Sequence, residues 1–141
     1  MAGKGSRVVF TDGVFDLLHA NHVAFLEEAK SFGDWLVVGV VSDLRAEDYK
    51  RRPILSQEER LRVVKALACV DEAFIIHDAL TFETMERIIA DYDVTAVVYA
   101  GDSTPEFYIA AERSGIMHRL PYRAGVNSSE IIGRILSRNG L

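Results

Sequence analysis

This chain of 141 residues has a single cysteine, no long apolar run and no excess of positive charge. Its single cysteine, Cys69, cannot form an internal disulfide, which suits a reducing cytoplasm. No run approaches the roughly 18 apolar residues of a membrane-spanning helix, and no apolar signal segment follows the polar start. The net charge of −5 provides no general attraction to nucleic acid or to an anionic membrane. The sequence therefore predicts a cytoplasmic protein with neither nucleic acid nor membrane among its partners.

The remaining composition is that of an ordinary globular domain, with 49% apolar and 26% charged residues. A chain of this length can bury enough surface to fold without a disulfide or a metal. We therefore expect residues 1–141 to form a single domain. The end of the chain, just after the last expected helix, is also compatible with excision of this domain from a longer chain.

Short apolar stretches alternate with helical patterns along the whole chain. The stretch from Trp35 to Val41 is continuously apolar, as in a strand that is buried on both faces. Ser56 and Glu59 form a capping-box pattern, which predicts a helix after Ser56. Strands are expected at residues 7–11, 35–41, 73–76, 94–100 and 116–120, and helices at 21–32, after Ser56, after Thr81, from the Thr104-Pro105 cap to Gly115, and from Asn127 to Gly140. This alternation predicts a Rossmann-like fold of the α/β class, a three-layer α/β/α sandwich with a five-stranded parallel sheet.

Two histidines follow the first expected strand, where such a sheet binds its ligands. His19 and His22, three residues apart, open a helix whose N-terminus favours anions. Gly13 permits close approach of the backbone to a phosphate. Positioned donors of this kind suit nucleotidyl transfer, because displacement of pyrophosphate adds charge to the oxygens of the α-phosphate. The alternatives are a plain capping pair or a zinc site, and no third zinc ligand stands nearby at a familiar spacing, so we expect no protein-bound metal.

Three further polar loops follow the other expected strands. Lys50 begins a basic run that can either reach a triphosphate or remain a solvated surface. Asp102 belongs to a Gly-Asp pair after the fourth strand, which is also a common turn. The loop from Arg123 to Ser129 contains glycine, arginine and hydroxyls ahead of a helix, which makes either a second anion cradle or an ordinary cap. All of these signals fall in the right loops of one architecture, and this joint placement predicts a nucleotidyltransferase.

These residues resemble the cytidylyltransferases of the H-x-G-H nucleotidyltransferase superfamily, with phosphoethanolamine and glycerol-3-phosphate cytidylyltransferases the most similar. The resemblance runs from Val8 to Leu136. Four stretches carry it: Asp12-Gly13 with Phe15-Asp16 before the histidines; Gly33 to Val40 leading to Ser42-Asp43; Gln57 to Arg60 with Val70-Asp71-Glu72; and Gly125 to Ser129 leading to Gly133-Arg134.

The resemblance implies a role for each matching residue. Lys50 would bridge the triphosphate and the acceptor phosphate, and Ser128 and Ser129 would hold the outer phosphates. The implied catalytic residues are His19, His22 and Lys50; the implied nucleotide-binding residues are Asp12, Gly13, Val14, Phe15, Asn21, Asp102, Arg123, Gly125, Asn127, Ser128 and Ser129; and the implied acceptor-binding residues are Lys50, Arg60 and Asp16. The resemblance also implies a magnesium ion held by the nucleotide, and a homodimer.

The chain departs from the family pattern at two places. Asn21 stands where the family has the glycine between its histidines, which either narrows the space for nucleotide or adds a contact to the ribose. In the last loop Arg123 stands two residues before Gly125, where the family spacing is three, and Asn127 replaces the first hydroxyl residue.

The function expected from all of this is transfer of CMP from CTP to a small phospho- or phosphono-alcohol, with release of pyrophosphate. Phosphoethanolamine, 2-hydroxyethylphosphonate and glycerol 3-phosphate are the candidate acceptors. The first alternative is an adenylyltransferase that uses ATP with a sugar phosphate or flavin mononucleotide. The second is a catalytically weak nucleotide-binding domain, which the Asn21 departure keeps open.

Overall fold

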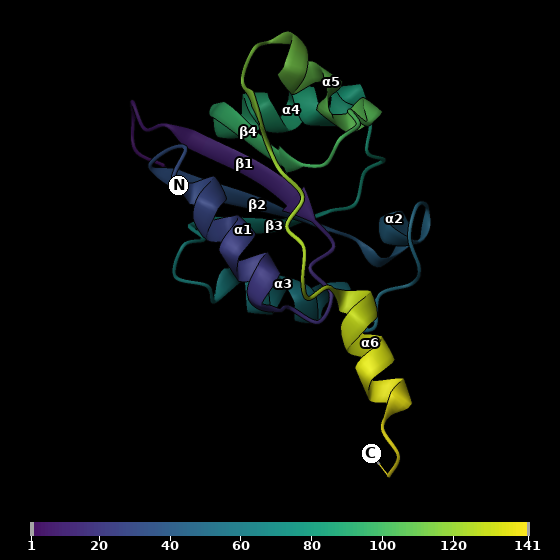
Figure 1. The fold of residues 1–141 in the computed structure, drawn as a ribbon. Helices are drawn as coiled ribbons and strands as arrows, with labels where there is room; N and C mark the ends of the chain where they lie inside the picture. Colours follow the sequence, from purple (N-terminus) through teal and green to yellow (C-terminus); the bar gives the residue numbers. More distant parts are fainter. Residues whose placement is uncertain (1, 141) are drawn as a thin grey trace.

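The computed structural model describes residues 2–140 and contains one sheet of five parallel strands (Figure 1). The strands are β1 (Val8–Gly13), β2 (Trp35–Val41), β3 (Glu72–Ile76), β4 (Val94–Ala100) and β5 (Met117–Leu120). Their order across the sheet is β3-β2-β1-β4-β5. The chain therefore winds outward from β1 in both directions, and the switch point between the two halves lies at β1 and β4.

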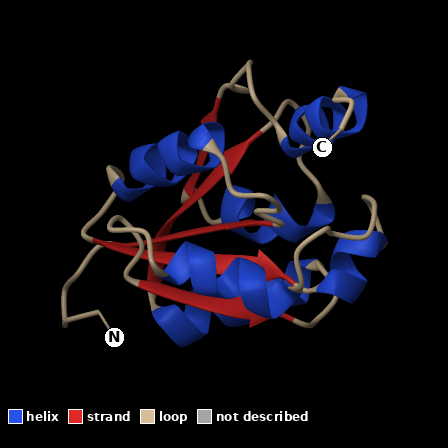
Figure 2. Ribbon diagram, turned by 90° about the horizontal axis from the view of Figure 1, so that it is seen from below, coloured by secondary structure: helices blue, strands red, loops and turns tan. Residues whose placement is uncertain are grey.

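Helices cover both faces of this sheet, which confirms the predicted α/β/α sandwich (Figure 2). The helices are α1 (Ala20–Lys30), α2 (Asp43–Glu47), α3 (Gln57–Lys65), α4 (Phe82–Tyr92), α5 (Glu106–Arg113) and α6 (Ser128–Ser137). In Figure 1, α6 projects away from the sheet, and none of its residues is buried. No helix within residues 2–140 has the length and apolar character needed to cross a membrane.

Two hydrophobic cores lie on the opposite faces of the sheet. Phe10 packs with α4 and α5 on one face, whereas its neighbour Val9 packs with α1 and α3 on the other. Successive residues of a strand point to opposite faces, so a strand that is covered on both sides has apolar residues throughout. This explains the unbroken apolar run of β2, whose bounds are those predicted.

Side chains cap three helices where the sequence predicted them. The Ser56 hydroxyl accepts from the backbone N–H of Glu59, whose carboxylate accepts from the N–H of Ser56 in return. The Thr81 hydroxyl caps α4, and the amide oxygen of Asn127 accepts from the N–H of Glu130 at the start of α6. These caps satisfy N–H groups that have no partner within the helix.

One predicted helix start and one predicted helix end were wrong. Thr104 does not cap α5, because Pro105 occupies the cap position and the Thr104 hydroxyl instead hydrogen-bonds the carboxylate of Glu112. The last helix ends at Ser137, before Gly140, and Arg138 leaves it in an extended conformation. The five-residue helix α2 was not predicted, because a single turn of helix carries no periodic pattern.

Candidate active site

A cavity of about 1020 Å³ lies beyond the carboxyl ends of the strands, as predicted for this fold. The loop after β1, the segment between α2 and α3, the end of β4, the start of α5 and the loop before α6 all contribute to its lining. Thirteen of the predicted site residues line it: Asp12, Gly13, Val14, Phe15, Asp16, His19, Asn21, His22, Lys50, Arg123, Asn127, Ser128 and Ser129. The cavity therefore gathers most of the expected residues from distant parts of the chain.

The two histidines cap α1 with their own side chains. His19 is the N-cap residue, and the backbone N–H of His22 donates to His19 Nδ1 over 3.4 Å. The backbone N–H of His19 donates to His22 Nδ1 over 3.2 Å, which completes a capping box made of two imidazoles. The rings stack with their centroids 3.7 Å apart. The capping pair that the sequence offered as an alternative is thus present, and both histidines also line the cavity.

This capping fixes the hydrogen-bonding state of both rings. Each Nδ1 accepts from a backbone N–H, so the neutral imidazole carries its proton on Nε2. Burial lowers the pKa of His22 to about 4, helped by the nearby charges of His19 and Lys50, and burial also lowers the pKa of His19. Both rings are therefore neutral at pH 7, and each can donate one Nε2–H hydrogen bond to an anion.

The loop between β1 and these histidines contains two residues in the left-handed backbone region. Phe15 has a φ of 54° and Leu17 a φ of 50°, a backbone region that side chains other than glycine rarely adopt. Such strain is retained where the surrounding structure fixes it, often next to a binding site. Gly13 makes room for this path, because a Cβ there would lie 2.9 Å from the ring of Phe15. The missing side chain of Gly13 therefore admits an aromatic ring of the chain itself, where the sequence had predicted an approach of phosphate.

Asp16 holds the segment that leads into α3. Its two carboxylate oxygens accept from the backbone N–H groups of Ile54 and Leu55, over 2.7 and 3.0 Å. The backbone carbonyl of Asp16 accepts a hydrogen bond from the hydroxyl of Ser128. Asp16 thus joins three of the loops that line the cavity, which gives it a positioning role within the region predicted to bind the acceptor.

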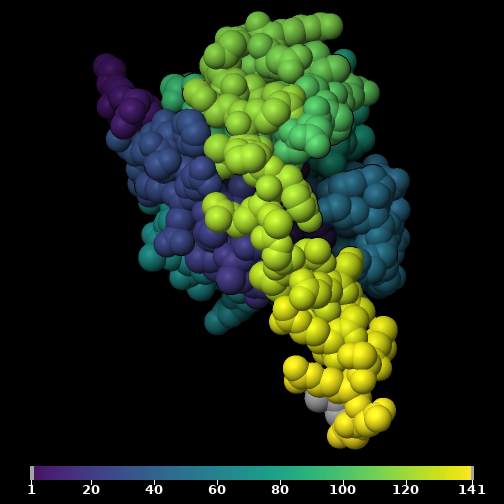
Figure 3. All heavy atoms as spheres, in the orientation of Figure 1, coloured from purple at the N-terminus to yellow at the C-terminus, as the bar shows by residue number. Residues whose placement is uncertain are grey.

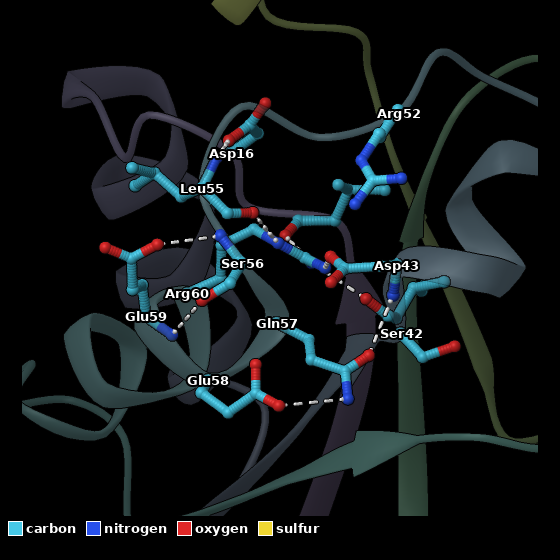
Figure 4. A network of polar contacts seen from close by, with 12 residues as sticks. Asp16, Ser42, Asp43, Arg52, Leu55, Ser56, Gln57, Glu58, Glu59 and Arg60 are labelled. Atoms are coloured by element: carbon cyan, nitrogen blue, oxygen red, sulfur yellow. Dashed lines mark hydrogen bonds and ion pairs between the residues drawn. The ribbon is translucent and has the colours of Figure 1, made fainter.

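Arg60 is fully buried beneath this segment (Figure 4). Its guanidinium donates to the carbonyls of Val14 and Val41, both over 2.7 Å, and to the carbonyl of Leu55 over 3.1 Å. It also pairs with the carboxylate of Asp43 over 2.7 Å. The guanidinium thus donates to groups of the protein itself, and Arg60 does not line the cavity. The prediction that Arg60 binds the acceptor therefore does not fit its placement.

Lys50 and Arg51 bring positive charge to the cavity from the segment after α2. Desolvation lowers the pKa of Lys50, whereas the carboxylate of Asp12 acts in the opposite direction. Arg51 donates to the hydroxyl of Ser129 over 3.0 Å, which links this segment to the start of α6. Arg51 was not among the predicted site residues, although it belongs to the basic run that the sequence analysis noted.

Asp12 lies in the cavity beside aromatic rings. It accepts a hydrogen bond from the hydroxyl of Tyr108, a residue of α5. The ring of Tyr108 packs against that of Tyr99, with centroids 4.2 Å apart. Burial raises the pKa of Asp12 to about 7, while the charge of Lys50 opposes the shift. Sequence reasoning missed both tyrosines, since an aromatic residue near the end of a strand or on an amphipathic helix looks like a core residue.

The family model for cytidylyltransferase-like proteins matches residues 10–134 of this chain. The chain belongs to the cytidylyltransferase-like family. The matched range contains every residue of the site described above.

Two kinds of curated relative are similar to nearly the whole of this chain. The chain is 35% identical over 141 residues to the bifunctional protein HldE of Pelobacter propionicus. This match covers 96% of the chain and 28% of that protein. It is 33% identical over 144 residues to the probable ethanolamine-phosphate cytidylyltransferase of Encephalitozoon cuniculi. That match covers 99% of the chain and 44% of the relative. The chain thus spans less than half the length of either relative.

Solved structures of this fold include the lipopolysaccharide core biosynthesis protein of Thermoplasma volcanium. That chain is 27% identical to this one, with a TM-score of 0.68, and the match covers 87% of this chain and 100% of that chain. Pantothenate synthetase of Thermus thermophilus is 15% identical with a TM-score of 0.61, over 89% of this chain and 61% of that one, and shares the fold.

Not every family position of this cytidylyltransferase-like chain reaches the cavity. Asp102 is exposed on the loop after β4 and does not line the cavity, although the family resemblance implied that it binds the nucleotide. Arg119 of β5 fixes this loop by donating to the carbonyls of Gly101 and Ser103. Gly125 is exposed and does not line the cavity, and its φ of 107° lies in the left-handed region that favours glycine.

Proposed function

We propose that this chain is a cytidylyltransferase that transfers CMP from CTP to phosphoethanolamine or a closely similar phospho- or phosphono-alcohol, releasing pyrophosphate. The single observation that carries the proposal is the histidine capping box. By using Nδ1 of both rings, it leaves two neutral Nε2–H donors in a cavity that also contains Lys50 and Arg51.

In the proposed reaction, an oxygen of the acceptor phosphate forms a bond to the α-phosphorus of CTP. The bond from the α-phosphorus to the bridging oxygen breaks, and pyrophosphate leaves with that electron pair. His19 and His22 donate to the oxygens of the α-phosphate, where charge accumulates in the transition state. Lys50, which lines the same cavity, would bridge the triphosphate and the acceptor phosphate, the role that the family resemblance implies.

Asp12 and the surrounding tyrosines support an acceptor with a primary ammonium group. A carboxylate attracts this cation, and Tyr99, Tyr108 and Tyr49, which also line the cavity, have rings of the kind that attract cations. Lys50, whose charge acts on Asp12, also lines the cavity and would bind the phosphate of the same small molecule. Phosphoethanolamine carries both groups, and the relative named as a probable ethanolamine-phosphate cytidylyltransferase is in line with this choice.

The second candidate is adenylyl transfer to a sugar phosphate, with flavin mononucleotide as a further acceptor for ATP. The observation that favours a sugar is the similarity to a lipopolysaccharide core biosynthesis protein, at 27% identity over the whole of that chain. The third candidate, a catalytically weak nucleotide-binding domain, rests on Asn21 at the family glycine position.

A magnesium ion bound to the triphosphate belongs to the proposal. The nucleotide would hold this ion, as the family resemblance implies. It would neutralise part of the charge of the triphosphate. The chain's own cations, Lys50 and Arg51, would hold the remaining negative charge. Homodimer formation and a cytoplasmic location also stay proposals from the sequence.

Pyrophosphate release with each of the four nucleoside triphosphates, crossed with a panel of acceptors, tests the proposal. The panel contains phosphoethanolamine, 2-hydroxyethylphosphonate, glycerol 3-phosphate, a sugar 1-phosphate and flavin mononucleotide. We expect release with CTP and phosphoethanolamine. Release with ATP and the sugar phosphate alone would replace this assignment with the second candidate. If no combination releases pyrophosphate while calorimetry still detects CTP binding, the third candidate, a catalytically weak nucleotide-binding domain, would be favoured.

A further inference from the structure

The side chain of Asn21 joins the first turn of α1 to the last loop of the chain. Its amide nitrogen Nδ2 donates to the carbonyl of Val126 over 2.8 Å and to the carbonyl of Ala124 over 3.1 Å. An amide nitrogen has two hydrogens, so both are used in this clamp. In Figure 3 the yellow-green segment before α6 lies against the purple-blue surface of α1.

Gly125 makes the double hydrogen bond geometrically feasible. Its φ of 107° lies in the region that favours glycine, and it allows the carbonyls on either side to turn toward one nitrogen. A Cβ at this position would lie 3.6 Å from Nδ2 of Asn21, which is an ordinary van der Waals separation. The conformation of Gly125, rather than the lack of a side chain, is therefore what suits it to this hydrogen-bonded loop.

The other link between this loop and α1 is weaker. Arg123 pairs with Glu28 over 3.0 Å, and both side chains are about half exposed. Exposed pairs of this kind contribute little to stability. Residues 21 and 28 lie two turns apart on one face of the helix, so the loop runs along α1 and Asn21 holds the end that is nearer the histidines.

We propose that Asn21 is a positioning residue for the triphosphate, which it serves by holding residues 121–127 against α1. This loop leads directly into Asn127, Ser128 and Ser129, so its position sets where the start of α6 faces the histidines. The inference rests on the proposed function, because it assigns the outer phosphates to that helix start. Asn21 acts through the loop, and its loss weakens nucleotide binding while leaving the reacting groups in place.

The first test is hydrogen exchange of the nucleotide-free protein, compared between wild type and Asn21→Gly. The backbone N–H groups of Glu130 and Ile131 donate to Asn127, the last residue of this loop, so loss of the two hydrogen bonds of Asn21 should speed exchange of these two amides about tenfold. Ala20→Gly is the matched control, since it weakens the same exposed helix turn without removing a contact to the loop. Equal exchange rates in Asn21→Gly and wild type would overturn the proposal. This readout needs no turnover, so it stays separate from the fate of the proposed function.

The second test measures nucleotide binding in the same variants. Calorimetry with inorganic triphosphate as the probe should show about tenfold weaker binding to Asn21→Gly, with Ala20→Gly close to wild type. In steady-state assays the KM for CTP should rise by the same factor, and kcat should change less than threefold. A fall in kcat at unchanged KM would overturn the proposal, because it would place Asn21 at the reacting atoms.

Asn21→Asp provides an isosteric variant that keeps the size of the side chain and loses both donors. Its carboxylate would face two carbonyl oxygens, so we expect amide exchange at Glu130 and Ile131 at least as fast as in Asn21→Gly. Wild-type protection in Asn21→Asp would show that the clamp does not depend on the amide hydrogens, and this result would also overturn the proposal.

Discussion

At the scale of single residues, the histidine pair shows how a helix cap can prepare a binding site. His19 and His22 satisfy two backbone N–H groups at the start of α1 with their Nδ1 atoms. The same hydrogen bonds select the Nε2–H form of each ring, and burial keeps both rings neutral by lowering their pKa values. Donors fixed in this way need no rearrangement when a phosphate arrives, which is the property that favours transition-state stabilisation.

Asp12 gives a prediction about pH at this scale. Burial raises its pKa to about 7, so the carboxyl group gains its charge as the pH rises from 6 to 8. An ammonium acceptor pairs with the charged form, so the KM for phosphoethanolamine should fall as pH rises through this range. Asp12→Asn should raise this KM about tenfold at pH 8 and remove the contribution of residue 12 to the pH dependence. Steady-state kinetics at a series of pH values measure both effects.

The nucleotide serves as the internal control for this experiment. The titration of the acceptor's own phosphate affects wild type and Asp12→Asn equally, so the difference between them reports Asp12 alone. The KM for CTP should be the same in both proteins. A rise in the KM for CTP with an unchanged acceptor KM would contradict the ammonium pocket and return Asp12 to the nucleotide-binding role that the family resemblance implied.

At the scale of secondary-structure elements, Arg60 explains how the segment between α2 and α3 keeps its place beside the cavity. This segment has little regular structure, yet it carries Lys50 and Arg51. Arg60 donates to the carbonyl of Leu55, near the end of this segment. It also donates to the carbonyls of Val14, just after β1, and Val41, the last residue of β2. A planar guanidinium reaches all of these acceptors at once, which an ammonium cannot do.

Arg60→Lys should therefore destabilise the protein by about 3 kcal/mol, because buried carbonyls lose their donors. Urea unfolding measures this loss. Arg62→Lys, an exposed position on the same helix, is the control and should change stability by less than about 0.5 kcal/mol. A variant with wild-type stability and a raised KM for the acceptor alone would contradict the structural role and restore the predicted acceptor contact.

The elements themselves were largely predictable from local pattern. β2 and the capping box at Ser56 follow directly from burial on both faces and from the pairing of a hydroxyl with a carboxylate. The direction in which a polar side chain points was harder to predict than its position along the chain. The sequence places Arg60 near the acceptor loops but cannot say whether its guanidinium faces a ligand or backbone carbonyls, because both partners are oxygens. For the same reason Thr104 resembled a cap although its hydroxyl meets Glu112.

At the scale of the whole molecule, the parallel topology brings distant loops to one cavity. Because ligands bind at the carboxyl ends of the strands, the loop positions alone predicted the gathering of the histidines, Lys50 and the start of α6. The tyrosines around Asp12 could not be predicted, since their rings reach the cavity only through the packing of α5 against β4. The clamp between Asn21 and the last loop spans more than 100 residues and equally depends on the assembled fold.

The measurement that tests the central claim most directly is kcat for pyrophosphate release from CTP and phosphoethanolamine, in wild type and His22→Ala. Removal of a transition-state donor should lower kcat by about 10²–10⁴. His77→Ala, which changes an exposed histidine outside the cavity, should leave kcat unchanged. A kcat for His22→Ala within a few-fold of wild type would contradict the account, because the transfer would then proceed without the histidine pair.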